Sequence, residues 1–140
     1  MPEFAQFIAW TATINQLTFP NSEGSFKTWE FPLPDLDTDR TALLMFKLSS
    51  SKETAAGSAT LVLTAEGPVV NEKFTFVLDN PAYAQPRSWQ EVIRAGIFAS
   101  SGNKLVVQGP PEGSGNKVTV SDVVIFYHAK TGTVVGPHPT

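Results

Sequence analysis

The sequence contains no cysteine, so disulfides, thiolate metal sites and a cysteine nucleophile are all excluded. Basic residues are few: ten Lys and Arg against thirteen Asp and Glu give a formal net charge of -3 at pH 7, and no two basic residues are adjacent. A protein that binds duplex nucleic acid or polyphosphates needs a concentrated positive surface. We therefore expect no nucleic-acid partner.

Long apolar runs are also missing. No segment approaches the ~20 consecutive apolar residues of a membrane-spanning helix. The amino terminus has neither the basic segment nor the apolar stretch of a signal peptide. These absences predict a soluble chain without a membrane span or a leader, and they leave its compartment open.

The sequence is rich, by contrast, in aromatic and β-branched residues grouped in short segments. Its 140 residues are enough for one ordinary domain, which buries roughly two-thirds of the surface of its unfolded chain. Ten phenylalanines and three tryptophans supply a core as thick as two packed sheets require. We expect a single domain over residues 1–140, ending in an irregular Gly- and Pro-containing tail at 131–140.

The most strongly β-patterned part of the chain extends from Asn103 to Ala129. It contains two apolar runs, Lys104 to Gln108 and Lys117 to Tyr127, joined by a linker rich in Gly and Pro. This arrangement predicts a hairpin with a long polar loop. The second run has too many consecutive apolar residues for a strand with one wet face, so it is predicted to be a central strand covered on both sides.

Further strands are marked by alternation of apolar and polar residues or, at Thr41 to Leu48, by a near-continuous apolar run. Prolines, glycines and asparagines separate them, and the segments Asn15 to Gly24 and Pro32 to Asp39 are expected to be turns or loops. The additional strands are expected at Phe4 to Ile14, Ser25 to Phe31, Thr41 to Leu48, Ser58 to Glu66 and Glu72 to Asp79.

One segment carries a helix signal. Ser88 followed by Glu91 has the spacing of a capping box, and Gly96 has the position of a C-terminal glycine. The sequence thus predicts one short helix over Ser88 to Ala95.

These expectations define a fold class. About seven or eight strands, one short helix and no alternation of strands with helices are typical of two antiparallel sheets packed face to face. We predict an all-β protein, a two-sheet antiparallel β-sandwich of jelly-roll type with one short helix.

The last third of the chain contains four motifs in a fixed order: Trp89 to Ile93, Gly96 to Phe98, the step Gly102 to Val107 into a strand, and the apolar closing segment Val118 to Tyr127. This order resembles galactose-binding-like jelly-roll domains, a superfamily that includes many carbohydrate-binding modules. The step here is one residue shorter than the Gly-x-Asn-x-Leu form of that superfamily. The resemblance implies a jelly roll and a lectin-like role, but no ligand-binding motif comes with it.

The loop from Asp79 to Trp89 has the composition best suited to binding a sugar. Aromatic planes stack on sugar rings, and planar polar groups bond to hydroxyls. An alternative is that Trp89 caps the core while Tyr83 only covers the loop. The candidate ligand-binding residues are Asp79, Asn80, Tyr83, Gln85, Arg87 and Trp89.

Asp35, Asp37 and Asp39 alternate in a Pro-bounded loop, a pattern that offers oxygen ligands for Ca²⁺. The glycine and glutamate of an EF-hand loop would fall at Arg40 and Phe46, so a solvated acidic turn is favoured. We predict no bound metal and no cofactor.

Catalytic motifs are not apparent. His128 is expected to be a strand-end histidine bonded to the backbone. Glu30, Glu66, Asp79 and Asp122 stand singly at expected strand ends or edges, where solvated surface charges are favoured, although the two acids of a glycosidase can be far apart in sequence. We therefore predict that the protein is not an enzyme.

Two functions remain open. The first is a non-catalytic carbohydrate-binding module that works through loops at one end of the sandwich. The second is a structural or assembly subunit, such as a viral, phage or particle-coat component, that forms homo-oligomers through strand edges and terminal tails. A carbohydrate or a second copy of the chain is the expected partner.

Overall fold

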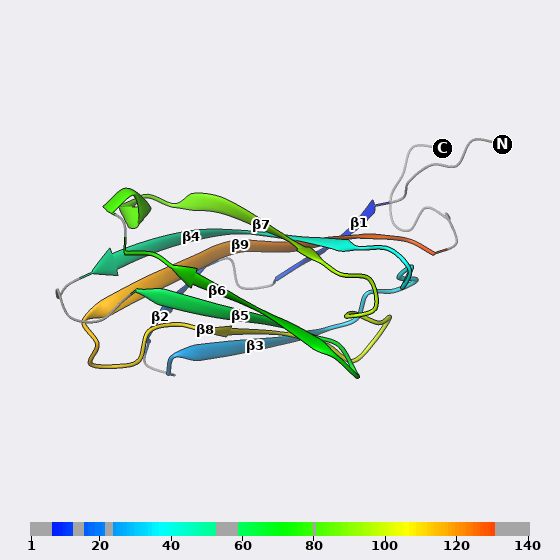
Figure 1. Cartoon of the computed structure of the whole chain (residues 1–140), viewed down its shortest axis with the longest axis horizontal. Helices are drawn as coiled ribbons and strands as arrows, with labels where there is room; N and C mark the ends of the chain where they lie inside the picture. The colour runs from blue at the N-terminus through cyan, green and yellow to red at the C-terminus, as the bar shows by residue number, and fades with distance from the viewer. Residues whose placement is uncertain (1–6, 13–15, 22–23, 53–58, 80, 131–140) are drawn as a thin grey trace.

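The computed structural model describes residues 7–12, 16–21, 24–52, 59–79 and 81–130. In them the chain forms an all-β sandwich of two antiparallel sheets (Figure 1). The fold class predicted from the sequence is therefore confirmed. The expected tail at 131–140 lies outside the described residues.

The first sheet has five strands, and β9 lies at its centre. One edge of β9 pairs with β4; the other pairs with β2 along the first half of β9 and with β1 along the second half. On the far side of β4 lies the edge strand β7. The strands are β1 (Phe7–Thr11), β2 (Gln16–Phe19), β9 (Asn116–His128), β4 (Ala42–Lys52) and β7 (Arg87–Ile93).

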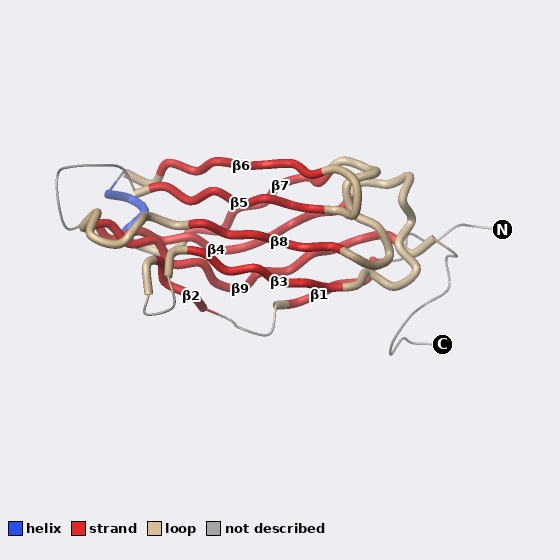
Figure 2. The backbone as a smooth tube through the Cα atoms, turned by 90° about the horizontal axis from the view of Figure 1, so that it is seen from below, coloured by secondary structure: helices blue, strands red, loops and turns tan. Residues whose placement is uncertain are grey.

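The second sheet has four strands in the order β3-β8-β5-β6 (Figure 2). From β2 onward, every connection except the β5–β6 hairpin crosses from one sheet to the other. This is the arrangement of a jelly roll. The strands are β3 (Phe26–Phe31), β8 (Asn103–Gln108), β5 (Thr60–Glu66) and β6 (Asn71–Val77).

The strands predicted at β3, β4, β5 and β6 are confirmed. In β5, Leu61, Leu63 and Ala65 are completely buried, whereas the intervening residues are half-buried. Such a strand is fixed by its own pattern, because a shift of one residue would turn every leucine to solvent.

β9 is central, as predicted, but it is covered on one face only. Val120 and then Val123 and Ile125 face the core, so the inward side changes parity at Asp122. Asp122 has a positive φ of 53°, and the register with β4 shifts between Met45 and Lys47. This β-bulge keeps both halves of β9 on the core. Residues between the buried ones lie on the outer face, contrary to the prediction.

The predicted hairpin between residues 104–108 and 117–127 is wrong. β8 and β9 lie in different sheets, and residues 109–115 cross between them. At the start of the crossing the Gly109 N–H donates to the Ser25 carbonyl at 2.7 Å, and a Cβ at Gly109 would run into the buried ring of Phe19. A loop of this length easily spans the ~10 Å between packed sheets.

The predicted helix at Ser88 to Ala95 is also wrong, because this segment forms β7. Seven consecutive residues of β7, from Arg87 to Ile93, pair with Leu48 to Ala42 of β4. Gly96 does adopt a positive φ of 91°, but in a turn after a strand. Pairing with β7 satisfies the backbone N–H and C=O groups along the edge of β4, which a helix in this segment would leave without partners. This tertiary pairing overrides the local capping pattern.

A single turn of 3-10 helix, η1 (Pro81–Ala84), is the one helical element of the described part of the chain. Nowhere in the described ranges is there a helix long and apolar enough to cross a membrane.

β2 was not expected, since Asn15 to Gly24 was predicted to be a turn. Its register places Leu17 opposite Val120 and the completely buried Phe19 opposite Val118. The strand has only four residues and runs directly into Pro20, so turn-forming residues dominate the local pattern.

Tyr127 joins β9 to the loop that follows β3. Its hydroxyl donates to the Pro34 carbonyl at 3.1 Å, and its ring is buried. Burial raises the pKa of the phenol above its ordinary value, and the Asp35 carboxylate acts in the same direction. The phenol is therefore held neutral in the folded state, and its contribution to stability is lost as the pH rises through its raised folded pKa.

We expect Tyr127→Phe to lower the free energy of unfolding by about 1 kcal/mol at pH 7, because the Pro34 carbonyl loses its donor. The same substitution removes the part of the alkaline stability loss that comes from Tyr127. Denaturant titrations of both proteins at pH 7 and at a pH above ~10, the ordinary tyrosine value, check this. The difference in free energy of unfolding between wild type and variant should be smaller at the higher pH. A difference that does not change with pH would contradict the role given to the Tyr127 hydroxyl.

Candidate functional site

The loop predicted to bind a ligand lies at the end of the sandwich where β4 ends and β7 begins (Figure 1). Its first residues are fastened to both sheets. Leu78 N–H donates to the Ala59 carbonyl at 2.7 Å, and the Ser50 hydroxyl donates to the Leu78 carbonyl at 2.7 Å. The Asp79 carboxylate accepts the Ala59 N–H at 2.7 Å. Asp79 thus anchors the start of the loop.

Trp89 faces the core from the edge strand β7. It lies opposite the buried Phe46 in the register of the first sheet. Its ring meets Phe76 of the second sheet edge to face, with centroids 5.1 Å apart, and Phe76 meets Phe46 in the same manner at 5.5 Å. The indole Nε1 is buried. Trp89 therefore closes the side of the sandwich between β6 and β7.

Tyr83, in η1, lies over Trp89. The two ring centroids are 5.9 Å apart with an interplanar angle of 33°. Tyr83 is half-buried, so the residue is partly exposed to solvent. A chain of rings thus leads from the surface at Tyr83 through Trp89 and Phe76 to the core.

Polar side chains flank this aromatic pair. Arg87 is two residues before Trp89 and therefore on the same side of β7. Arg87 and Gln85 are exposed, whereas Asn80 lies outside the described residues. The structure brings Tyr83 and Trp89 into contact and places Arg87 on the same side of β7 as Trp89, while the Asp79 carboxylate bonds to the Ala59 backbone.

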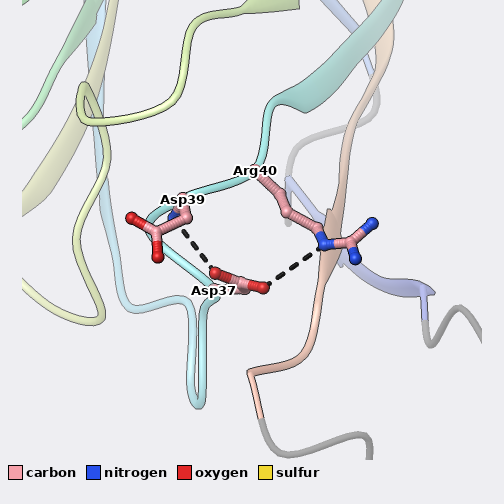
Figure 3. Close-up of polar contacts among 3 residues, drawn as sticks. All are labelled: Asp37, Asp39 and Arg40. Carbon is pink, nitrogen blue, oxygen red and sulfur yellow. Dashed lines mark hydrogen bonds and ion pairs between the residues drawn. The ribbon is translucent and has the colours of Figure 1, made fainter. Parts of the chain in front are cut away.

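The acidic loop after β3 is held by its own contacts (Figure 3). One Asp37 oxygen accepts the Asp39 N–H at 3.0 Å, and the other lies 3.4 Å from Arg40 Nε. The Asp35 carbonyl accepts the Lys130 N–H at 2.6 Å. This is an Asx turn with an ion pair. The described residues include no group of three or more His, Cys, Asp or Glu that fits a metal ion.

Three of the candidate acids lie beside lysines, and Glu30 and Glu66 stand on either side of Lys104 in the second sheet. Glu30 lies 3.7 Å from Lys104, and Asp122 lies 3.3 Å from Lys47. Glu66 is opposite Lys104 in the sheet register. Each of these three acids therefore lies beside a lysine on a neighbouring strand.

His128 ends β9 and is half-buried. Its carbonyl accepts the Asp37 N–H at 2.9 Å, which ties the acidic loop to the end of the strand. The position at the end of β9 agrees with the prediction; this bond is made by the main chain, and the bond expected of the imidazole stays a prediction.

A hollow of about 390 Å³ that was not predicted from the sequence lies where β3 ends and β8 begins, lined by Glu30, Phe31, Pro32, Gly102, Asn103 and Lys104. Its main polar groups are engaged: Glu30 pairs with Lys104, and the buried Asn103 amide bonds to the Ala99 N–H at 2.8 Å and carbonyl at 2.7 Å. The Gly-Asn step that suggested a family resemblance therefore closes a turn. The same Gly102-Asn103 step is the sequence feature that could have pointed to this hollow.

Comparison with known proteins supports the fold. No family model matches the chain, and no curated protein matches its sequence. Among solved structures, the dimeric latent PorU from Porphyromonas gingivalis is similar with a TM-score of 0.52 and 14% identity, over 92% of this chain. The match spans only 13% of the PorU chain.

Two further structures have lower scores. TmCBM61 in complex with β-1,4-galactotriose has a TM-score of 0.48 and 9% identity, covering 89% of this chain and 90% of that one. The Desmodium yellow mottle tymovirus structure has a TM-score of 0.38 and 10% identity, covering 92% and 90%. At such identities a likeness concerns the fold alone, and function has to be argued from the site.

Proposed function

We propose that this protein is a non-catalytic carbohydrate-binding module whose site is formed by η1 and the start of β7. The observation that carries the proposal is the half-buried Tyr83, whose ring lies over Trp89 with the two ring centroids 5.9 Å apart. The apolar C–H face of a sugar packs on such a plane, and a ring that is already immobilised loses little entropy when it binds.

We assign the hydrogen bonds to the sugar hydroxyls to Arg87 and Gln85, together with Asn80 from the same loop. The guanidinium is a planar fork of N–H donors, suited to two neighbouring hydroxyls, and an amide offers both a donor and an acceptor. Trp89 and Asp79 support the site: Trp89 holds Tyr83, and Asp79 fixes the loop through Ala59.

We expect Tyr83→Ala to weaken sugar binding roughly ten-fold, because loss of the stacking contact removes about 1 to 2 kcal/mol. The fold should persist, since the ring is only half-buried at the surface. Calorimetric titration of mono- and oligosaccharides into both proteins measures the change. The absence of heat with every sugar, or equal affinities for wild type and variant, would exclude this function.

Two variants separate binding from stability. Tyr83→Phe keeps the ring and should retain most of the affinity. Trp89→Ala removes a ring that contacts Phe76 and Tyr83, so it should lower the free energy of unfolding by about 3 kcal/mol or more. A Trp89→Ala protein of wild-type stability would show that the indole does not support the site in this way.

A further inference from the structure

The outer face of the first sheet is divided into an apolar half and a polar half. On the apolar half, side chains from all four positions across the sheet face away from the core. Val92 is 56% exposed there, although it is a large aliphatic residue. We call this surface the apolar patch; it consists of Ala9, Leu43, Met45, Val92, Val124 and Phe126.

The strand register makes the patch continuous. Phe126 of β9 lies opposite Ala9 of β1 on one side and Leu43 of β4 on the other, and Leu43 lies opposite Val92 of β7. One uninterrupted apolar row thus crosses four strands. In the next row Val124 lies opposite Met45. Residues directly opposite in a sheet have side chains in contact, so these residues form one surface.

The polar half begins at the bulge. Lys47 and Asp122 form an ion pair there at 3.3 Å, and beyond it the hydroxyls of Thr18 and Thr119 bond at 2.8 Å. Lys47 and Asp122 thus border the apolar patch at one end, and His128 follows Phe126 on the same face at the other end, while the patch itself contains no ionisable residue. A contiguous apolar patch rimmed by polar residues is typical of an interface between proteins.

We propose that the apolar patch is the contact surface between two copies of this chain related by a twofold axis. A sheet face is broad and flat, and a second sheet face is the surface that packs on it best, with side chains interdigitating at ~10 Å separation. A twofold axis through the patch places the same uncharged residues against each other, so no charge is buried without a partner.

The size of the face suits a stable dimer. β9 has 13 residues, β4 has 11, β1 and β2 together have 9, and β7 has 7. At ~3.3 Å per residue and ~4.8 Å between strands, the face measures about 630 Å². Stable interfaces bury ~600 to 1,000 Å² on each partner, with an apolar centre and a polar rim. The patch would supply the centre, and the half with Lys47 and Thr119 part of the rim.

The test compares Val92→Lys with Val77→Lys. Val77 is 57% exposed and lies on β6, an edge strand of the other sheet. It therefore matches Val92 in exposure and in its place on an edge strand, but it lies outside the apolar patch. Sedimentation velocity over a dilution series measures the dimer dissociation constant. We expect a wild-type dimer, a Val92→Lys dissociation constant at least ten-fold higher, and an unchanged Val77→Lys dimer.

A wild type that remains monomeric at the highest concentration overturns the proposal, as does equal weakening by both lysines. Thermal melts establish that each variant is folded. If Val92→Lys does not fold, the similarly shaped Val92→Thr replaces it, and a dimer as tight as wild type then overturns the proposal. The readout is mass, so the outcome does not depend on whether any sugar binds at Tyr83.

Discussion

Replacing Phe46 with alanine is expected to lower the free energy of unfolding by about 3 to 5 kcal/mol. Phe46 is 2% exposed and projects from β4 into the space between the sheets. It meets Phe76 of the opposite sheet edge to face at 5.5 Å and lies opposite Trp89 in register. Loss of the ring would leave a cavity between the two sheets, next to Phe76 and to Trp89, which supports the proposed binding site.

Phe26→Ala is the matched control, because Phe26 is 66% exposed at the start of β3. The same chemical change there should cost less than ~1 kcal/mol. Chemical denaturation of the two variants gives both values. Similar losses in the two proteins would contradict the position of the core between β4 and β6.

The second large effect is expected at Gly67, in the β5–β6 turn. Gly67 N–H donates to the Val70 carbonyl at 2.9 Å and closes this turn. A Cβ on Gly67 would overlap the backbone carbonyl of Ile97, which belongs to the connection from β7 to β8. A backbone atom cannot rotate away as a side chain does, so the turn and the connection must separate. We expect Gly67→Ala to cost about 2 to 3 kcal/mol.

Gly113→Ala tests a different constraint on glycine, the positive φ of the backbone. Gly113 has a positive φ of 81°, and no atom lies within 4 Å of the added Cβ. It should therefore cost only the conformational penalty of a left-handed residue, about 1 to 2 kcal/mol. Melts of both variants decide the order. If Gly113→Ala is the more damaging, close packing of the β5–β6 turn on Ile97 is not the constraint at this end of the sandwich.

Local periodicity was sufficient for much of the fold. Leu61 and Leu63 alternate with polar or half-buried residues, and this pattern can be satisfied only by a strand with one face on the core. The number of such segments and the absence of βαβ alternation then restrict the class to a β-sandwich. The loop with aromatic and planar polar side chains could also be found from the sequence, because Tyr83, Gln85 and Arg87 are close together in it.

Pairing partners could not be predicted in the same way. The segment Ser88 to Ile93 is short and carries both a capping pattern and residues that suit a strand, and the free edge of β4 determined its state. β8 and β9 are adjacent in sequence and each reads as a strand, yet which sheet each joins depends on neighbours far away in the chain.

The sequence by itself determined the class of fold, the main strands and the loop with aromatic and planar polar residues, because these depend on neighbours within a few positions. Only the tertiary structure decided that Trp89 supports Tyr83 from the core side, that Asp79 bonds to Ala59, and that Ala9, Leu43, Val92 and Phe126 form one row. The physical reason is that side-chain contacts in a jelly roll join strands distant in sequence, and their register is set by the packing of both sheets together.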